Sequence, residues 1–316
     1  MGETKMKVLF MGTPDFAVPT LDALVKGGYD VIGAVTQPDK PRGRGYQLMP
    51  PPVKVYAIEN NIPVFQPTTL RGEEFAEQLA LLDPEVIVVV AYGKILPVNV
   101  LDYPKYGCVN VHGSLLPEYR GAAPMQRAII DGKTETGITT MLMAAGLDTG
   151  DMLLKESVAI GEDDNFEDIH DRLAVVGADL LIKTLKGLEA GEITPEVQDD
   201  SKSTYAAKIE KSDCAIDFSL DAKTVHDKIR GLSPIPLSFT HTPDGKLLKI
   251  AKSRLVDADK TPKCLPGTVI EVGEDIKVAC GKGIISLLTV LPEGKGRMSA
   301  ADFVRGRKIA AGDLLA

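Results

Sequence analysis

The sequence predicts an α/β protein whose first part is an open, mostly parallel sheet and whose last part is a small β-barrel. Three observations support this prediction. Short β-branched runs alternate with helical stretches over residues 1–189, and a polar stretch without periodicity follows at 190–208. Several apolar runs separated by turn residues then fill 209–316. Alternating strands and helices favour a parallel sheet with helices on both faces.

Four apolar runs of the first part are short, rich in β-branched residues and bounded by Gly or Pro, as expected of strands buried on both faces. These runs are residues 7–12, 31–37, 86–91 and 108–112. Between them, apolar residues recur at helical spacing at 15–26, 53–60 and 73–82. This order predicts a Rossmann-like domain over residues 1–189. Ligands of such sheets bind beyond the carboxyl ends of the strands.

The longest helical pattern covers residues 166–190, and the polar segment 190–208 that follows it is interpreted as a linker. We then expect a helix at 221–231 and a hairpin, because Pro-Asp-Gly at 243–245 separates two alternating runs. Several short strands within about 100 residues are typical of small barrels, and oligonucleotide-binding barrels are one class of these. We assign this barrel to residues 209–316.

The charge of the chain is unevenly distributed. The total of −8 argues against a protein that coats nucleic acid without specificity. Residues 209–316 carry 17 Lys and Arg against 14 Asp and Glu, a net charge of +3, whereas residues 1–208 carry 19 against 30, a net charge of −11. Either the second part alone meets a polyanion, or the difference is chance variation between two domains.

The composition is that of an ordinary globular protein, with 44% hydrophobic and 25% charged residues. The apolar run near the start is too short for a signal peptide, and no stretch approaches the roughly 18 apolar residues of a membrane span. We therefore expect a soluble, cytoplasmic protein. Its cysteines form no CxxC pair, so we expect free thiols rather than a zinc site. They are Cys108, Cys214, Cys264 and Cys280.

Three common site motifs are incomplete. Gly12 follows the first strand, but GTPDFA lacks the other glycines of a dinucleotide-binding GxGxxG. Arg127 stands where a phosphate loop ending in GKT at 132–134 would need its first glycine. The GxSxG turn of serine hydrolases is absent. These absences remove nucleotide-dependent redox chemistry, NTP hydrolysis and serine hydrolase chemistry from the leading functions.

Asn110 and His112 are the clearest candidates for catalytic residues. They alternate at the end of the fourth strand, so both side chains point to one face at the edge where a ligand would bind. An amine attacking a formyl or acyl carbon creates an oxyanion, which an amide N–H and an imidazolium can stabilise. A carboxylate would orient the imidazole and help to move the proton.

The carboxylate is expected to be Asp148, on the glycine-flanked loop MAAGLDTGDM that follows the β-like run 138–143, with Asp151 as its rival. A structural alternative stays open at this point. His112 could be a hydrogen-bonding residue of the fold, and Asp148 a turn former.

The segment NVHGSLLPEYRGAAPMQRAI together with GLDTGDML resembles the signature of the folate-dependent formyltransferases, and most closely of the methionyl-tRNA formyltransferases among them. Further segments that resemble this family occur along nearly the whole chain. They are MGTPDFAVPTLDAL, TQPDKPRGRGYQLMPPPVK, FQP, VVVAYGKILP, TPEVQD, PGTVIEV and GRMSAADFVRG.

The resemblance implies that Asn110 and His112 hold the formyl oxyanion and that Asp148 sets the state of the histidine and relays a proton. The implied donor is 10-formyltetrahydrofolate, without a metal. The folate would lie against one loop and the pterin near the backbone that follows the third strand. The implied residues are Ser114, Leu115, Leu116 and Pro117 for the folate, and Ala91, Tyr92 and Gly93 for the pterin.

The resemblance also implies initiator methionyl-tRNA as the partner of a monomeric enzyme. The loop 38–52 would enter the acceptor stem, and basic residues of the last part would contact phosphates. Read without the family, the loop is simply exposed and flexible. The expected tRNA contacts are Lys40, Arg42, Arg44, Lys246 and Lys249, with further basic residues at Lys252, Arg254, Lys295, Arg297, Arg305 and Arg307.

Two departures from the family pattern stand out: Glu118 occupies a position where a basic residue is common, and the chain has no Trp. Three alternatives are weighed. Glycinamide ribonucleotide formyltransferases lack a C-terminal barrel, and amino-sugar formyltransferases lack the loop GRGYQLMPPP. A non-catalytic RNA- or folate-binding protein would not need the Asn-x-His pair and the distant Asp.

Overall fold

The computed structural model describes residues 5–42, 47–306 and 308–316, without the side chains of Arg42 and Gln47. The chain forms two compact units. The first extends to Gly121 and also contains 137–158 and 170–205, and the second contains 122–136, 159–169 and 206–316. Two segments that precede the predicted linker, 122–136 and 159–169, therefore belong to the second unit.

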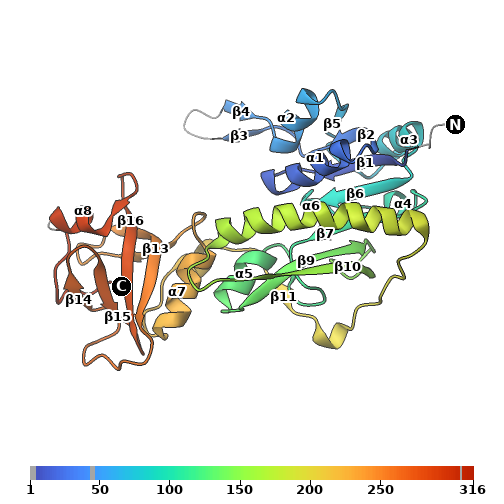
Figure 1. Cartoon of the computed structure of the whole chain (residues 1–316). Helices are drawn as coiled ribbons and strands as arrows, with labels where there is room; N and C mark the ends of the chain where they lie inside the picture. The colour runs from blue at the N-terminus through green and yellow to red at the C-terminus, as the bar shows by residue number, and fades with distance from the viewer. Residues whose placement is uncertain (1–4, 43–46, 307) are drawn as a thin grey trace. The chain divides into compact units, whose positions relative to one another are not determined.

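The first unit is built on a seven-stranded sheet (Figure 1). Five neighbouring strands are parallel, and β9 runs antiparallel to β7 at one side of them. This mostly parallel α/β arrangement confirms the predicted fold class of the first part. In spatial order the strands are β10 (Met152–Ala159), β9 (Glu135–Leu142), β7 (Cys108–His112), β6 (Val86–Val90), β1 (Lys7–Gly12), β2 (Asp30–Val35) and β5 (Val64–Phe65).

Helices pack on both faces of this sheet. Residues of α3 and α4 share a buried cluster with Leu9, Ile87 and Cys108, so these two helices cover one face. The other face of β7 meets α6, because a Cβ on Gly177 would lie 2.9 Å from Val111 Cγ1. Glycine at this position allows the helix to approach the strand. The helices are α1 (Val18–Lys26), α2 (Pro52–Glu59), α3 (Glu73–Leu82), α4 (Val98–Leu101) and α6 (Phe166–Ala190).

The element boundaries depart from the sequence predictions at a few places. The predicted helix 15–26 is divided into a 3-10 helix, Asp15–Ala17, and α1, because Pro19 suits the first turn of a new helix rather than a helix interior. The predicted loop 38–52 contains a short antiparallel pair, β3 (Lys40–Arg42) and β4 (Gln47–Met49). The prolines and glycines of this stretch had hidden the pairing.

The second unit is an antiparallel barrel around its own buried core. The strand order is β12-β13-β16-β15-β14, and β17 pairs with β16. The end of the chain connects the two edges: Val269 N–H donates to Asp313 C=O, and His241 N–H donates to Ala316 C=O. The predicted small barrel is thereby confirmed. Its strands are β12 (Ser238–His241), β13 (Leu247–Asp257), β14 (Val269–Val272), β15 (Ile276–Ala279), β16 (Ile284–Pro292) and β17 (Met298–Ser299).

Shorter elements complete both units. In the second unit α5 (Pro124–Ile130) packs against α7 (Ala222–Gly231), whose first turn is capped by the carboxylate of Asp221. The second unit also contains the 3-10 helix Lys211–Cys214 and α8 (Ala300–Arg305). Two-residue strands occur at β8 (Arg120–Gly121) and β11 (Tyr205–Ala206). Among the described residues, no helix has both the length and the apolar character required to span a membrane.

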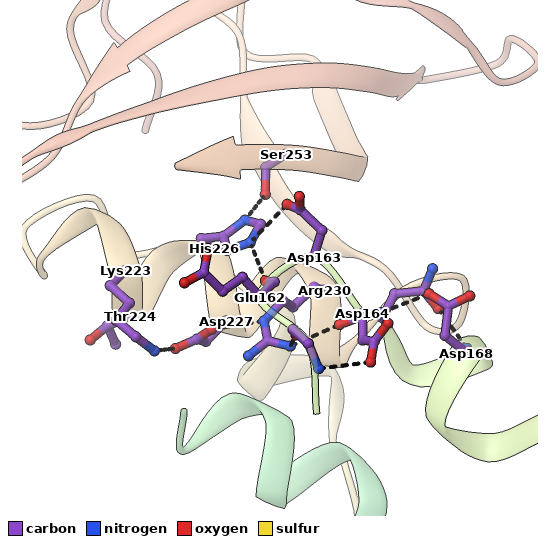
Figure 2. Close-up of polar contacts among 12 residues, drawn as sticks. Glu162, Asp163, Asp164, Asp168, Lys223, Thr224, His226, Asp227, Arg230 and Ser253 are labelled. Atoms are coloured by element: carbon purple, nitrogen blue, oxygen red, sulfur yellow. Dashed lines mark hydrogen bonds and ion pairs between the residues drawn. The ribbon is translucent and has the colours of Figure 1, made fainter. Parts of the chain in front are cut away.

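A buried polar network on α7 organises the second unit (Figure 2). Arg230 Nε donates to Asp227 Oδ1 at 2.7 Å, and Arg230 Nη1 donates to the carbonyls of Gly161 and Asp164. One turn earlier, His226 Nε2 lies 3.1 Å from Glu162 C=O and Nδ1 lies 2.9 Å from Ser253 Oγ. The network therefore joins α7 to the segment 159–169, which explains why this segment belongs to the second unit.

Candidate active site

Asn110 and His112 lie on β7 near its carboxyl end, and both side chains are buried. They share the face that carries Cys108, whereas Val111 points to the opposite face and contacts α6 at Gly177. In the strand register Asn110 lies opposite Met141 and His112 opposite Thr139 of β9. The alternation read from the sequence therefore places both polar side chains together, as expected.

The backbone of the following loop sets the tautomer of His112. His112 Nε2 lies 3.0 Å from the carbonyl oxygen of Tyr119. Because a carbonyl can only accept, Nε2 carries the proton and Nδ1 is the nitrogen left for chemistry. His112 Nδ1 lies 3.8 Å from Asp148 Oδ2. This separation is longer than a direct hydrogen bond and is suited to an ion pair or a bridging water.

Asp148 is held at both its side chain and its backbone. Its Oδ2 atom accepts the N–H of Gly121 at 2.8 Å. Its φ angle of 51° lies in the left-handed region, which most L residues avoid but Asp tolerates. Asp151, the rival carboxylate, accepts the N–H of Leu142 through its backbone carbonyl. Of the two candidates, Asp148 is the one whose carboxylate pairs with His112 Nδ1.

The loop Ser114–Pro117 is held by hydrogen bonds to the neighbouring Glu118 and to Thr139 of β9. Ser114 Oγ donates to Glu118 C=O at 2.7 Å, and Thr139 Oγ1 both accepts the N–H of Leu116 and donates to Ser114 C=O. Ser114 and Leu116 have buried side chains, whereas those of Leu115 and Pro117 are partly exposed. The accessible side-chain surface of this loop therefore belongs to Leu115 and Pro117.

Residues 91–93 directly follow β6, beside β7. Ala91 and Gly93 are exposed and have positive φ angles of 46° and 85°. Tyr92 points into the core, and burial raises the pKa of its hydroxyl to about 12. Its carbonyl accepts hydrogen bonds from Thr13 Oγ1 and Gln37 Nε2. The backbone of this segment is thus presented at the same sheet edge as His112, because β6 and β7 are parallel.

The residues expected to contact tRNA differ in how they are placed. Lys40 is exposed on β3. The Arg42 side chain and all of Arg44 lie outside the described residues. Lys246 is exposed and pairs with Asp244, a hydrogen bond that holds the pKa of that carboxyl at about 2. Lys249 is partly exposed on β13.

The further basic residues of the barrel are also at the surface. Lys252 and Arg254 lie on β13, Lys295 and Arg297 lie in the loop before β17, and Arg305 is the last residue of α8. The exposed residues are Lys252, Arg254, Lys295, Arg297 and Arg305, whereas Arg307 lies outside the described residues.

Several residues around this site were missed from the sequence. Tyr119 and Thr139 position the histidine and its loop through the backbone carbonyl and the hydroxyl described above. Gln198 donates to the backbone of the Asp148 loop. The signal for Gln198 was present, because TPEVQD resembles a segment of the formyltransferases, but its residues had no assigned role. Within the described residues, no group of three or more His, Cys, Asp or Glu side chains could hold a metal.

Two family models match the chain. The model of the formyl transferase family matches residues 4–185, and that of the formyl transferase C-terminal domain matches residues 208–308. Among solved structures, an N-formyltransferase from Helicobacter canadensis in complex with folinic acid and dTDP-3-aminofucose covers 89% of this chain and 98% of its own, with a TM-score of 0.68 and 20% identity. HypX from Aquifex aeolicus in complex with tetrahydrofolic acid covers 95% of this chain and 47% of its own, with a TM-score of 0.63 and 16% identity. At these identities the two structures show a shared fold.

Relatives of much higher identity cover both units. The methionyl-tRNA formyltransferase of Geotalea uraniireducens is 50% identical over 311 residues, which are 98% of this chain and 98% of the relative. The methionyl-tRNA formyltransferase of Lachnospira eligens is 49% identical over 98% of this chain and 99% of its own. The similarity therefore includes the barrel as well as the sheet. The chain belongs to the methionyl-tRNA formyltransferase family.

Proposed function

We propose that this protein transfers the formyl group of 10-formyltetrahydrofolate to the α-amino group of methionine carried by initiator tRNA. The observation that carries the proposal is the pair formed by His112 and Asp148. The carbonyl of Tyr119 fixes the tautomer of His112, and the N–H of Gly121 orients the carboxylate of Asp148. The products are N-formylmethionyl-tRNA, which serves translation initiation, and tetrahydrofolate.

The reaction is an acyl transfer that passes through a tetrahedral intermediate. The amine forms a bond to the formyl carbon, the carbonyl becomes an oxyanion, and the bond from that carbon to N10 of the folate then breaks. The Asn110 amide and protonated His112 stabilise the oxyanion. Asp148 orients the imidazole and relays the proton from the amine towards N10, with water as the bridge. The formyl group is already an activated acyl donor, so this route proceeds without a covalent enzyme intermediate.

The donor is proposed to bind at the edge formed by the carboxyl ends of β6 and β7. The exposed backbone at Ala91 and Gly93 receives the pterin, and the loop Ser114–Pro117 contacts the folate with its accessible residues Leu115 and Pro117. Ser114, Leu116 and Tyr92 support this surface from within, because their side chains are buried.

The acceptor is proposed to use two groups of basic residues. Lys40, Arg42 and Arg44 contact the acceptor stem, and the barrel domain contacts phosphates through Lys246, Lys249 and its other exposed basic residues. We retain the domain assignment of 1–189 for catalysis, 190–208 for the linker and 209–316 for tRNA. We also expect a monomer that acts in the cytoplasm.

The test is an acceptor comparison with the full-length protein. Charged initiator methionyl-tRNA and 10-formyltetrahydrofolate should yield formylmethionyl-tRNA and tetrahydrofolate in equal amounts. An amino-sugar nucleotide and glycinamide ribonucleotide serve as competing acceptors. Formylation of one of these small molecules, with none on the tRNA, would reject the proposed acceptor. Binding of tRNA and folate without turnover would instead identify a non-catalytic binding protein.

A further inference from the structure

The loop that presents Asp148 has a backbone that needs external support. Besides the left-handed φ angle at Asp148, the loop contains Gly150, where an added Cβ would lie 1.7 Å from Leu142 C=O. The carbonyls of Asp148 and Gly150 both turn towards one side chain, that of Gln198. Its Nε2 atom donates to Asp148 C=O at 2.8 Å and to Gly150 C=O at 2.7 Å. The two hydrogens of the amide are therefore both used.

The orientation of the Gln198 amide is fixed by its other end. Gln198 Oε1 accepts from Arg120 Nε at 2.9 Å, and Arg120 Nη2 pairs with Asp200 Oδ1 at 2.7 Å. A flipped amide would place its oxygen against two carbonyls and its nitrogen against a guanidinium, so only one orientation satisfies every partner. The Gln198 residue is 7% exposed, so a lost partner there would not be replaced freely by solvent.

The same chain segment supports both residues of the proposed pair. Glu196 and Met152 exchange two backbone hydrogen bonds of 2.8 Å. Further along, Thr204 Oγ1 accepts the N–H of Tyr119, whose carbonyl binds His112 Nε2. Residues 196–204 thus connect the backbone that holds the histidine with the loop that holds the carboxylate. This segment lies between the two ranges matched by the family models, which are 4–185 and 208–308.

We propose that Gln198 is a positioning residue for formyl transfer, which keeps the Asp148 carboxylate opposite His112 Nδ1 by clamping the carbonyls of Asp148 and Gly150. The inference rests on the proposed catalytic role of Asp148. Gln198 itself touches neither substrate. Its effect is therefore expected in the rate of the chemical step and not in the binding of tRNA or folate.

The first test is the variant Gln198→Met, which keeps the length of the side chain and removes its hydrogen bonds. Because displacement of a reacting group by about 1 Å costs on the order of 100-fold in rate, kcat should fall by roughly 10- to 100-fold. The KM values for tRNA and donor should stay within about twofold, as expected when an interaction that acts only on the transition state is lost. Gln78→Met on α3 is a substitution of the same chemistry at a residue with no contact to the Asp148 loop among those described above, so it is the matched control and should retain wild-type kcat.

The second test uses Gln198→Glu, which preserves the shape but replaces the donating amide by a carboxylate. It should lose kcat like Gln198→Met if donation to the two carbonyls is the role. Wild-type kcat in the glutamate variant would overturn the proposal, because shape alone would then suffice. This variant also retains an acceptor for Arg120, so a loss of kcat shared by both variants is not explained by the lost contact to Arg120.

The decisive measurement is a double-mutant cycle between Gln198→Met and Asp148→Asn. If Gln198 acts through Asp148, the double variant should lose no more kcat than Asp148→Asn alone. Additive losses would overturn the inference while leaving the role of Asp148 intact. Wild-type kcat in Asp148→Asn would instead reject the proposed catalytic role of that carboxylate, and the inference with it, so the two failures are distinguishable.

Discussion

At the scale of single residues, the site depends on which atoms the backbone leaves available. The carbonyl of Tyr119 occupies His112 Nε2, and the N–H of Gly121 occupies Asp148 Oδ2. Both bonds come from the chain that follows the Asn-x-His pair. Backbone groups of Tyr119 and Gly121 therefore decide which atoms of His112 and Asp148 are available for the reaction.

Replacement of Asp148 by Asn is expected to abolish most of the activity. The variant keeps an oxygen for Gly121 but removes the charge that faces His112 Nδ1, and proton transfer by a positioned group contributes about 10²- to 10⁴-fold. We expect kcat to fall within that range, with tRNA binding unchanged in a filter-binding assay. The matched control is Asp151→Asn, three residues along the same loop. If kcat fell in Asp151→Asn and not in Asp148→Asn, the catalytic carboxylate would be that of Asp151.

Gly150→Ala should damage the same site through the backbone. An added Cβ would lie 1.7 Å from Leu142 C=O, so the loop must shift. Overpacking of this kind typically costs about 1 to 3 kcal/mol. We expect a lower midpoint of thermal unfolding and a reduced kcat, whereas Gly296→Ala, which has open space around its Cβ position, should change neither. An active, equally stable Gly150→Ala enzyme would contradict the role that we assign to the close approach of Gly150 to Leu142.

At the scale of elements, the site is assembled from the end of one strand, one turn and one connecting segment. β7 contributes the histidine, the turn before β10 contributes the aspartate, and the segment from Glu196 to Thr204 connects them. In the second unit, α7 has the corresponding organising role, because its buried His226 and Arg230 hold the segment 159–169. The buried charge of Arg230 is paired with Asp227, as burial of a guanidinium requires.

The buried His226 should make the stability of the second unit depend on pH. Burial is the main cause that lowers the pKa of His226 from 6.5, against the opposing effects of the Glu162 carbonyl, Asp227 and Asp163. Because the unfolded histidine binds a proton more readily, the unfolded state gains protons first as the pH falls. The stabilising contribution is thus complete above the unfolded pKa of about 6.5 and is lost as the pH falls through the folded pKa.

We expect the free energy of unfolding of the wild type to decrease between pH 7.5 and pH 5.5. The free energy of unfolding of His226→Gln should decrease less over the same interval. Urea unfolding at the two pH values provides the measurement. His241→Gln is the control, since His241 is exposed and should leave the pH dependence of the wild type unchanged. An identical pH dependence in wild type and His226→Gln would show that carboxylates alone account for the acid sensitivity.

At the scale of the whole molecule, two groups of basic residues serve one proposed ligand. The chain as a whole is acidic, with a net charge of −8, whereas residues 209–316 are positive. Contacts to the acceptor stem and contacts to phosphates further along the tRNA are expected to act together. The relatives of about 50% identity extend over both parts, which is consistent with a substrate that both parts must recognise.

Arg42→Ala combined with Arg44→Ala should impair the use of tRNA more than the binding of the donor. We expect kcat/KM for methionyl-tRNA to fall by at least tenfold, since a lost bidentate contact of an arginine to a base costs about 1 to 3 kcal/mol, whereas folate binding should change less than twofold. The wild-type KM for tRNA should also rise steeply with salt, and less steeply in the variant. Equal losses for tRNA and donor would assign the loop to folding or to the donor site.

Much of this architecture could be predicted because it follows from local chemistry. β-branched runs, helical periodicity and the Pro243-Asp244-Gly245 turn determine which residues form strands, helices and hairpins, and strand alternation alone places Asn110 beside His112. The prediction was less accurate where proline and glycine mask short pairings, as in β3 and β4, and where Pro19 divides a helix.

The sequence by itself determined the fold class, the order of elements and the residue types available for acyl transfer, because these depend on local periodicity and side-chain chemistry. Only the tertiary structure decided which carboxylate faces His112 Nδ1, which nitrogen of the histidine carries the proton, and that Gln198 clamps the loop of Asp148. These features depend on contacts between residues that are 7 to 50 positions apart, and no local pattern specifies them.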